Sequence, residues 1–207
     1  MADPYVINLD RRTDRWTELE GEWKGVFKLT RVSAVETSPG GVGCTLSHIK
    51  VCEEAKARGD PYVLVWEDDC TPRNRHPRAI KALWDEVLPT LAKHRDKWDI
   101  ILGATSAAYK GATRNPLLST PNVTVYDLPH GFTTHWTMYN ESSYDKMIEW
   151  KAVREPQNDV YMFQHFRIKV VMPFLAEQRP SYSDLVNEDT NYHHMFERTE
   201  EQLKNIQ

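Results

Sequence analysis

Three consecutive carboxylates, Glu67, Asp68 and Asp69, directly follow the most apolar strand-like segment of the sequence, residues 61–66. Successive side chains of an extended chain point to opposite faces, so we expect Glu67 and Asp69 to share one side and Asp68 to take the other. Neighbouring carboxylates repel one another, and a hard divalent cation such as Mg²⁺ or Mn²⁺ stabilises them through oxygen ligands. We interpret this cluster as a candidate metal site; acids that cap the next segment or face solvent are the alternative.

Strand-like and helix-like segments alternate around this cluster. Short apolar or β-branched runs predict strands at residues 5–9, 27–32, 61–66, 99–103, 123–128, 132–139 and 168–172. Apolar residues at helical spacing predict helices at residues 12–24, 45–58, 77–93, 141–151 and 159–166, and an exposed polar helix near the end. This order predicts an α/β/α sandwich with a central mixed β-sheet. The ligand crevice of such a sheet lies beyond the carboxyl ends of its strands, where the three acids stand.

Length and composition limit the class of protein. The chain has 207 residues, which suits one domain, and 26 Lys and Arg against 30 Asp and Glu give a net charge of −4. This balance argues against binding to nucleic acid or anionic lipid through bulk charge. No apolar stretch approaches the length of a membrane span, and the first residues lack the pattern of a signal peptide.

The three cysteines, Cys44, Cys52 and Cys70, form no CxxC pair. Their number and spacing predict neither a disulfide framework nor a structural zinc site. We therefore expect three reduced thiols in a cytoplasmic protein.

Three segments, in this order and at these separations, resemble the motif blocks of glycosyltransferase family 25, which includes lipooligosaccharide and collagen galactosyltransferases. They are YVINLDRRTDRW at residues 5–16, GCTLSH at residues 43–48 and VLVWEDD at residues 63–69. Two later elements resemble the family more weakly: Asp159, after the Pro156-containing loop, and the pair Ser183-Asp184.

The resemblance implies a GT-A-like fold, a UDP-sugar donor and dependence on Mn²⁺ or Mg²⁺. It also implies a saccharide, glycoprotein or glycolipid acceptor, and neither a nucleic-acid partner nor a transmembrane segment. Within a single domain, residues 1–100 would form the nucleotide-sugar and metal half, residues 101–190 the acceptor half and residues 191–207 a polar tail. Single-domain viral and bacterial relatives of this kind lack secretion signals, which agrees with a cytoplasmic location, the host cytoplasm for a viral protein.

Metal-assisted departure of the UDP group assigns roles to the acids. A divalent cation that bridges the diphosphate neutralises the negative charge that develops as the bond to the sugar breaks. Asp69 is the first choice of direct ligand, with Glu67 or Asp68 binding the metal or the ribose. A third ligand is often supplied late in such folds, and His193, or its neighbour His194, is the candidate; two solvent-facing histidines are the alternative.

The other two blocks are expected to hold the nucleotide. Asn8, Leu9 and Asp10 end the first strand beside the crevice and are assigned to the uridine, and Arg11 and Arg15 to the phosphates. A structural pair of Arg15 with Asp10 or Asp14 is the alternative. Ser47 and His48 are expected at the beginning of a helix, whose N-terminus favours an anion, although a buried structural His48 is an equal alternative.

An inverting transfer also needs a general base that takes the proton of the acceptor hydroxyl, and Asp159 is the candidate. The alternative is that Asp159 caps the helix that follows it.

Two other classes of function remain open at this stage. A nucleotidyltransferase also places paired acids at a strand end, but it usually has a Gly-rich phosphate loop with a Lys near the first strand. The glycine-rich residues 39–43 come after the second predicted strand and contain no Lys. A non-catalytic module that binds sugar nucleotides or glycans is the third possibility, which turnover would exclude.

Overall fold

A central mixed sheet organises the chain. The computed structural model describes residues 3–107, 111–155, 157–184 and 188–206, so Pro156 of the loop before Asp159 lies outside the described residues. Within these ranges eight strands form one sheet, in the order β2 (Thr30–Ser33), β1 (Tyr5–Asn8), β3 (Tyr62–Glu67), β8 (Trp136–Asn140), β5 (Ile100–Leu102), β9 (Ile168–Met172), β7 (Thr124–Leu128) and β6 (Thr113–Arg114). β1 is parallel to β2 and β3, whereas β8 is antiparallel to β3 and β5.

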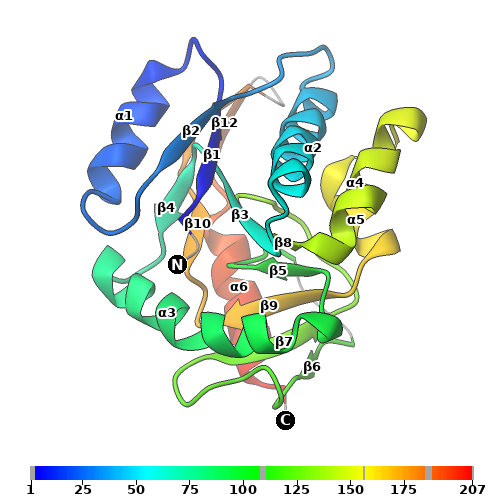
Figure 1. Ribbon diagram of the computed structural model, residues 1–207. Helices are drawn as coiled ribbons and strands as arrows, with labels where there is room; N and C mark the ends of the chain where they lie inside the picture. The colour runs from blue at the N-terminus through cyan, green and yellow to red at the C-terminus, as the bar shows by residue number, and fades with distance from the viewer. Residues whose placement is uncertain (1–2, 108–110, 156, 185–187, 207) are drawn as a thin grey trace.

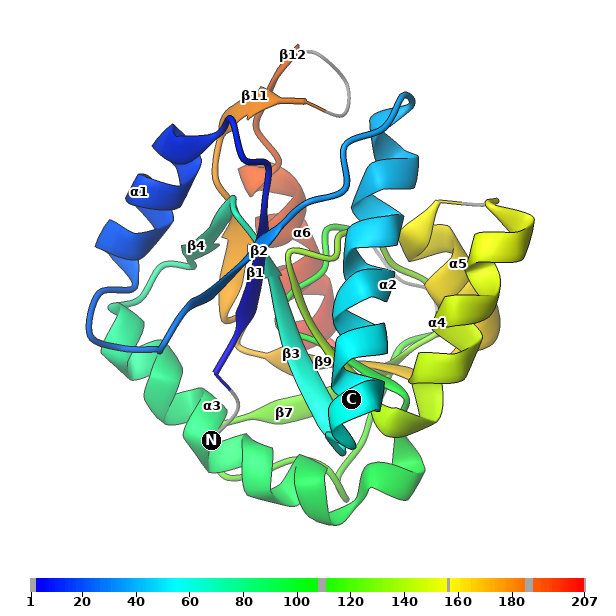
Figure 2. The ribbon, with the colours of Figure 1, turned by 45° about the horizontal axis from the view of Figure 1, so that its top comes forward.

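Helices cover both faces of this sheet (Figures 1 and 2). α1 (Thr13–Glu22) and α3 (Pro77–Lys93) lie on one side, and α2 (Gly40–Arg58), α4 (Glu141–Val153) and α5 (Asn158–His165) lie on the other. Each side encloses its own cluster of buried apolar side chains. The predicted α/β/α sandwich with a mixed sheet is confirmed. None of the described helices combines the length and the apolar character needed to cross a membrane.

Short elements that the sequence pattern did not predict complete the fold. A 3₁₀ turn, Arg95–Lys97, connects α3 to β5. β4 (Cys70–Pro72) pairs with β10 (Ala176–Gln178), and β11 (Ser181–Ser183) pairs with β12 (Glu188–Thr190), both in antiparallel fashion. Strands of three residues are too short to show a periodic pattern, so only tertiary pairing defines them.

β3 carries the carboxylate cluster and is the best-buried strand at the site. Val63, Leu64, Val65 and Trp66 are each at most 3% exposed. The Trp66 ring lies 4.8 Å from that of Trp23 on the α1 side and 4.3 Å from that of Trp136 in the neighbouring strand β8. Cover on both faces explains why the strand is apolar at every position instead of alternating.

α2 begins earlier than its apolar pattern predicts. The glycine-rich segment is not a loop: the helix starts at Gly40, after Pro39, and runs to Arg58. Gly43 stands inside it, where a Cβ atom would lie 2.3 Å from the carbonyl oxygen of Val35. Glycine at this position therefore allows the first turns of α2 to pack directly against the segment that follows β2.

β8 and the C-terminal segment also differ from expectation. β8 begins at Trp136 instead of residue 132. The C-terminal segment forms the predicted helix, α6 (His193–Lys204), but it is not a solvated tail, because Phe196 and Leu203 are at most 1% exposed and join the apolar cluster on the α2 side. Apolar residues spaced a few positions apart in a polar segment were enough to bury one helix face.

The side chain of Asp99, the residue before β5, connects this strand to β9 and to α4. Its carboxylate accepts hydrogen bonds from the backbone and guanidinium of Arg167, which precedes β9, at 2.8–2.9 Å, and from Ser142 in the first turn of α4 at 2.8 Å. Burial by itself would raise the pKa of Asp99, but the bonds from Arg167 and Ser142 lower it below its ordinary value.

We expect Asp99→Asn to lower the free energy of unfolding at pH 7 by about 1–3 kcal/mol, because a neutral amide leaves Arg167 without its ionic partner. The pKa of Asp99 is lower in the folded than in the unfolded chain, so its stabilisation is present above the ordinary aspartate pKa and is lost as the pH falls through the folded value. Urea unfolding at a series of pH values should therefore show the free energies of unfolding of the wild-type protein and Asp99→Asn becoming equal in acid. Asp96→Asn, at an exposed neighbouring carboxylate, is the control, and equal stabilities of the two variants at pH 7 would contradict this account.

Candidate functional site

A cavity of about 510 Å³ opens at the carboxyl ends of β1, β2 and β3. The crevice rule for α/β sheets placed it there from sequence alone. Its lining includes the following predicted site residues: Leu9, Arg11, Arg15, Ser47, Glu67, Asp68, Asp69 and Asp159. Segments from both halves of the sequence therefore meet in one place.

The three carboxylates all face this cavity. β3 ends at Glu67, and a turn follows it, so the expected alternation of sides does not continue to Asp68 and Asp69. A single guanidinium nitrogen of Arg15, Nη2, lies 2.9 Å from Asp68 Oδ1 and 2.9 Å from Asp69 Oδ2. Arg15 thus bridges two acids of the cluster, and the alternative pairs with Asp10 or Asp14 are not formed.

The side chain of Asn8 contacts Asp68, one of the two acids that Arg15 bridges. Its side-chain amide donates to Asp68 Oδ2 at 2.6 Å and accepts from Arg31 Nε at 2.8 Å. Because Asn8 is 1% exposed and is not among the cavity residues, it positions Asp68 instead of touching a ligand.

Burial and mutual repulsion set the acidity of Asp68 and Asp69. Burial raises the pKa of Asp68 to about 6, with Arg15 acting against this shift and Asp69 adding to it. Burial likewise raises the pKa of Asp69, with Arg15 opposing and Glu67 reinforcing the shift. Within the described part of the chain no group hydrogen-bonds Asp69 Oδ1, although this atom is buried. A buried acceptor without a partner at a cavity wall is suited to binding a cation.

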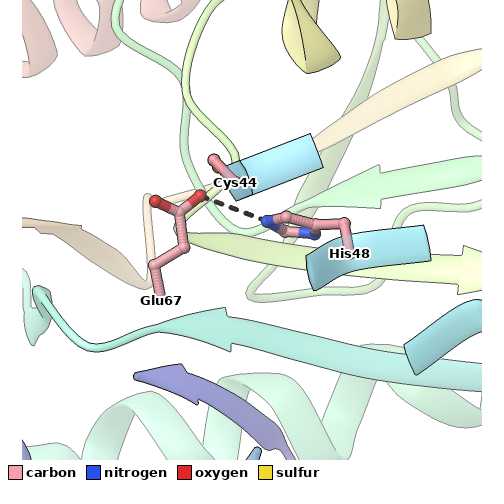
Figure 3. A group of neighbouring side chains, drawn as sticks. All are labelled: Cys44, His48 and Glu67. Carbon is pink, nitrogen blue, oxygen red and sulfur yellow. Dashed lines mark hydrogen bonds and ion pairs between the residues drawn. The ribbon is translucent and has the colours of Figure 1, made fainter. Parts of the chain in front are cut away.

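Glu67 has a separate set of partners. Its Oε1 lies 3.3 Å from His48 Nε2 and accepts from Thr134 Oγ1 at 2.5 Å, and Cys44 stands beside the same pair (Figure 3). Burial alone would raise the pKa of Glu67, but the hydrogen bond and positive charge of His48 lower it. Glu67 is therefore the carboxylate of the three that stays ionised most readily.

His48, Ser47 and Asp10 are placed differently from what the sequence analysis expected. Because α2 begins at Gly40, Ser47 and His48 are not at its N-terminus. Ser47 bonds the backbone of Gly43 and Val35, and His48 is fully buried, which was the alternative for that residue. Asp10 is exposed and pairs with Arg31, outside the cavity lining.

His193 does not reach the carboxylate cluster. Its Nδ1 lies 2.8 Å from Glu177 Oε2 and its Nε2 3.1 Å from Glu197 Oε1, and it is not among the described residues that line the cavity. Glu177 is in turn paired with the buried Arg73 at 2.5 Å. The expected third ligand is thus committed to a charged network between α6 and β10, and the expectation is corrected on this point.

Asp159 lines the same cavity as the three carboxylates at the end of β3. Helix α5 begins at Asn158 after Gln157, so Asp159 is inside its first turn and is not the N-cap residue. Burial raises the pKa of Asp159, and backbone N–H groups of Val160 and Thr133 oppose this shift. Thr133 has a φ of 80°, a costly conformation for a β-branched residue, and this strain is located at the site.

Sequence reasoning missed several residues of the cavity. Cys44, Thr134 and Gln178 line it, as does Asp184, noted only as part of a weak motif, which pairs with Arg11 at 2.9 Å. Cys44 and His48 are four residues apart, but the helix predicted at residues 45–58 begins after Cys44, so this spacing gave only a weak signal. Thr134 lies in the segment predicted as a strand at residues 132–139, whereas the strand begins at Trp136, and Gln178 ends a three-residue strand that carries no pattern.

Comparisons with known proteins do not identify a family for this chain. No protein-family model matches this chain, and no curated protein matches its sequence. Solved structures with a similar fold include a glycosyltransferase involved in the glycosylation of the major capsid of PBCV-1, which is 9% identical with a TM-score of 0.46 over 96% of this chain and 98% of that one. An apo UDP-glucose pyrophosphorylase is 10% identical, with a TM-score of 0.43 over 98% and 81% of the two chains. A protein from STIV is 10% identical, with a TM-score of 0.46 over 82% and 81%.

We expect Asp68→Asn to make the metal-free protein more stable at pH 7, by about 1–3 kcal/mol, because it removes the cost of burying an ionised carboxylate. The raised pKa of Asp68 means that this cost grows as the pH rises from about 4 to 6, so the difference should vanish near pH 4. Thermal unfolding of both proteins in chelator at pH 4 and pH 7 measures it. A variant that is destabilised equally at both pH values would contradict this account.

Proposed function

We propose that this protein is a metal-dependent glycosyltransferase that transfers a hexose from a UDP-sugar to a saccharide or glycoconjugate acceptor. The observation that carries the proposal is the buried Asp69 Oδ1, which has no hydrogen-bond partner among the described residues, in a cavity that it shares with Glu67, Asp68 and Asp159. The resemblance of three sequence blocks to glycosyltransferase family 25 supports it, and so does an α/β/α sandwich that presents acids at a central strand end.

The donor atoms suit Mn²⁺ or Mg²⁺. Asp69 offers a free buried carboxylate oxygen, and Glu67 beside it is ionised. Such ions accept carboxylates from one side and water and phosphate oxygens from the other. When bound, the ion would neutralise charge on the departing diphosphate. Arg15 holds Asp68 and Asp69 in place for this task and offsets part of their repulsion.

The rest of the cavity offers places for the nucleotide. Its volume of about 510 Å³ lies within the usual range for small-molecule sites. Leu9 and Val35 provide apolar wall beside β1 and β2, and Gly40 and Gly41 bring the N-terminal turn of a long helix to the cavity. Peptide N–H groups at such a terminus favour phosphate oxygens. We therefore assign the diphosphate to the space between this helix end and the acids.

Asp159 is proposed as the general base for the acceptor. Burial raises the pKa of Asp159, which makes its carboxylate a stronger base, and it lines the same cavity as the metal-binding acids. Phe132, which is 49% exposed and lines the cavity, offers an aromatic face on which a sugar ring can pack.

We expect UDP and its cognate UDP-sugar to raise the thermal midpoint by roughly 5–10 °C at about 100 times the dissociation constant, and only with Mn²⁺ present. Asp69→Ala should abolish this shift, because it removes the free ligand oxygen. Asp145→Ala, at an exposed carboxylate of α4, is the matched control and should keep it. Differential scanning fluorimetry with a panel of UDP-sugars measures the effect.

The absence of a thermal shift with every UDP-sugar, with metal present, would overturn the proposed function.

If one UDP-sugar does stabilise the protein, analysis of the reaction products separates the three classes of function. Release of UDP with transfer of the sugar supports the proposal, release of pyrophosphate from UTP and a sugar phosphate indicates a nucleotidyltransferase, and binding without turnover indicates a non-catalytic module.

We expect Asp159→Asn to lower kcat by about 10²–10⁴-fold, because the acceptor hydroxyl loses its base. The Mn²⁺-dependent thermal shift with UDP should persist, since Asp159 is on the acceptor side. Steady-state assays and fluorimetry on the same preparation measure both. An unchanged kcat would exclude the base role and leave Asp159 as an acceptor-binding residue.

A further inference from the structure

A second, chemically different donor set lies beside the acids, on α2. Cys44 and His48 are four residues apart and so project from the same face of this helix toward the end of β3. One ligand atom each from Cys44, His48 and Glu67 lies within 4.8 Å of the other two (Figure 3). A sulfur, an imidazole nitrogen and a carboxylate oxygen therefore converge on one point.

The ring of His48 is held in the orientation that a metal ligand needs. The Tyr139 hydroxyl lies 3.0 Å from His48 Nδ1 and can direct its own proton to Met162 Sδ, 3.5 Å away, which leaves its oxygen free to accept from an Nδ1–H group. The other ring nitrogen, Nε2, is directed at Glu67 Oε1, 3.3 Å away, and donates its proton to this carboxylate; a bound ion would take the place of that proton. Metal-bound histidines are oriented by just this kind of hydrogen bond through the second ring nitrogen.

We propose that Cys44, His48 and Glu67 form a binding site for Zn²⁺, separate from the hard-cation position at Asp69. Thiolate and imidazole ligands favour Zn²⁺ over Mg²⁺ and Mn²⁺, which prefer oxygen. Three protein ligands leave the fourth position of a tetrahedral ion for water or a cavity ligand, as in zinc sites that do chemistry.

The dimensions of the cluster fit such an ion. Bonds of about 2.0–2.3 Å to a tetrahedral Zn²⁺ place ligand atoms roughly 3.3–3.8 Å apart, so a contraction of about 1 Å closes the site. Cys44 and Glu67 line the cavity, which gives the ion a path of entry, while His48 is fully buried behind them. Thr134, which donates to Glu67 Oε1, helps to fix the position of the carboxylate.

Glu67 belongs to both donor sets, so replacing it would impair both metal positions. The test therefore replaces the other two ligands, with Cys44→Ser and His48→Asn. The asparagine amide can keep the hydrogen bond that His48 Nδ1 makes to Tyr139 while removing Nε2. Cys52→Ser, two helical turns further along α2 at a fully buried cysteine, is the control, and Asp69→Asn reports on the hard-cation position.

The experiment measures zinc and cobalt binding by the full chain. We expect the chelator-treated protein to take up one Zn²⁺ per chain after dialysis and to gain a thiolate-to-cobalt absorption band with Co²⁺. Cys44→Ser and His48→Asn should lose the band and weaken Zn²⁺ binding by at least about 10-fold, as loss of a metal-site group does. Cys52→Ser and Asp69→Asn should keep both. Circular dichroism confirms that each variant is folded.

Two results would overturn the zinc site. Failure of the folded wild-type protein to bind Zn²⁺ would leave His48 and Glu67 as an ion pair. Zinc binding that survives in Cys44→Ser but disappears in Asp69→Asn would show the ion at the hard-cation position instead. Either result leaves the Mn²⁺-dependent shift with UDP unaffected, so the failure of this site and the failure of the proposed function are separately observed.

Discussion

Three adjacent carboxylates at the buried end of one strand are the constraint on which the site depends. Carboxylates that leave water in this way must be met by positive charge or hydrogen bonds. Each partner comes from a different element: Arg15 from α1, Asn8 from β1, His48 from α2, and Thr134 from the segment before β8. Compensation of the acids therefore draws the surrounding elements to the carboxyl end of β3.

The positive charge and the hydrogen bonds that offset the three acids are divided unequally among them. Glu67 is satisfied by His48 and Thr134, while Asp68 and Asp69 share one nitrogen of Arg15. Burial raises the pKa values of both, and one guanidinium shared between them offsets this only in part; Asp69 Oδ1 is left without a donor in the described chain. The folded protein thus carries an electrostatic cost at this point that a bound cation would offset. Sites that are costly to the free protein are where ligand binding is most favourable.

Aromatic packing beneath the acids keeps this arrangement rigid. Trp23, Trp66 and Trp136 contact one another at ring distances of 4.3–5.8 Å directly below the end of β3. Trp66 immediately precedes Glu67, so any movement of the acidic segment would disturb this cluster. The three rings are not among the described residues that line the cavity, so they support the acidic segment from within the core, whereas the cavity wall around Asp159 comes from loops and the first turn of α5.

The sequence by itself determined the sheet-and-helix alternation and the position of the acids at a strand end, because these follow from local apolar periodicity and the crevice rule. The expectation that Arg15 and Asp159 stand near the acids came from the resemblance of the sequence blocks to a known family. Tertiary structure alone decided which partner each charge takes. His193 pairs with Glu177 instead of approaching Asp69, and Cys44 meets Glu67 although 22 positions separate them in the chain. Partner choice depends on distances between elements that are remote in sequence, and one helix start, moved from residue 45 to Gly40, is enough to change which residues lie at its N-terminus.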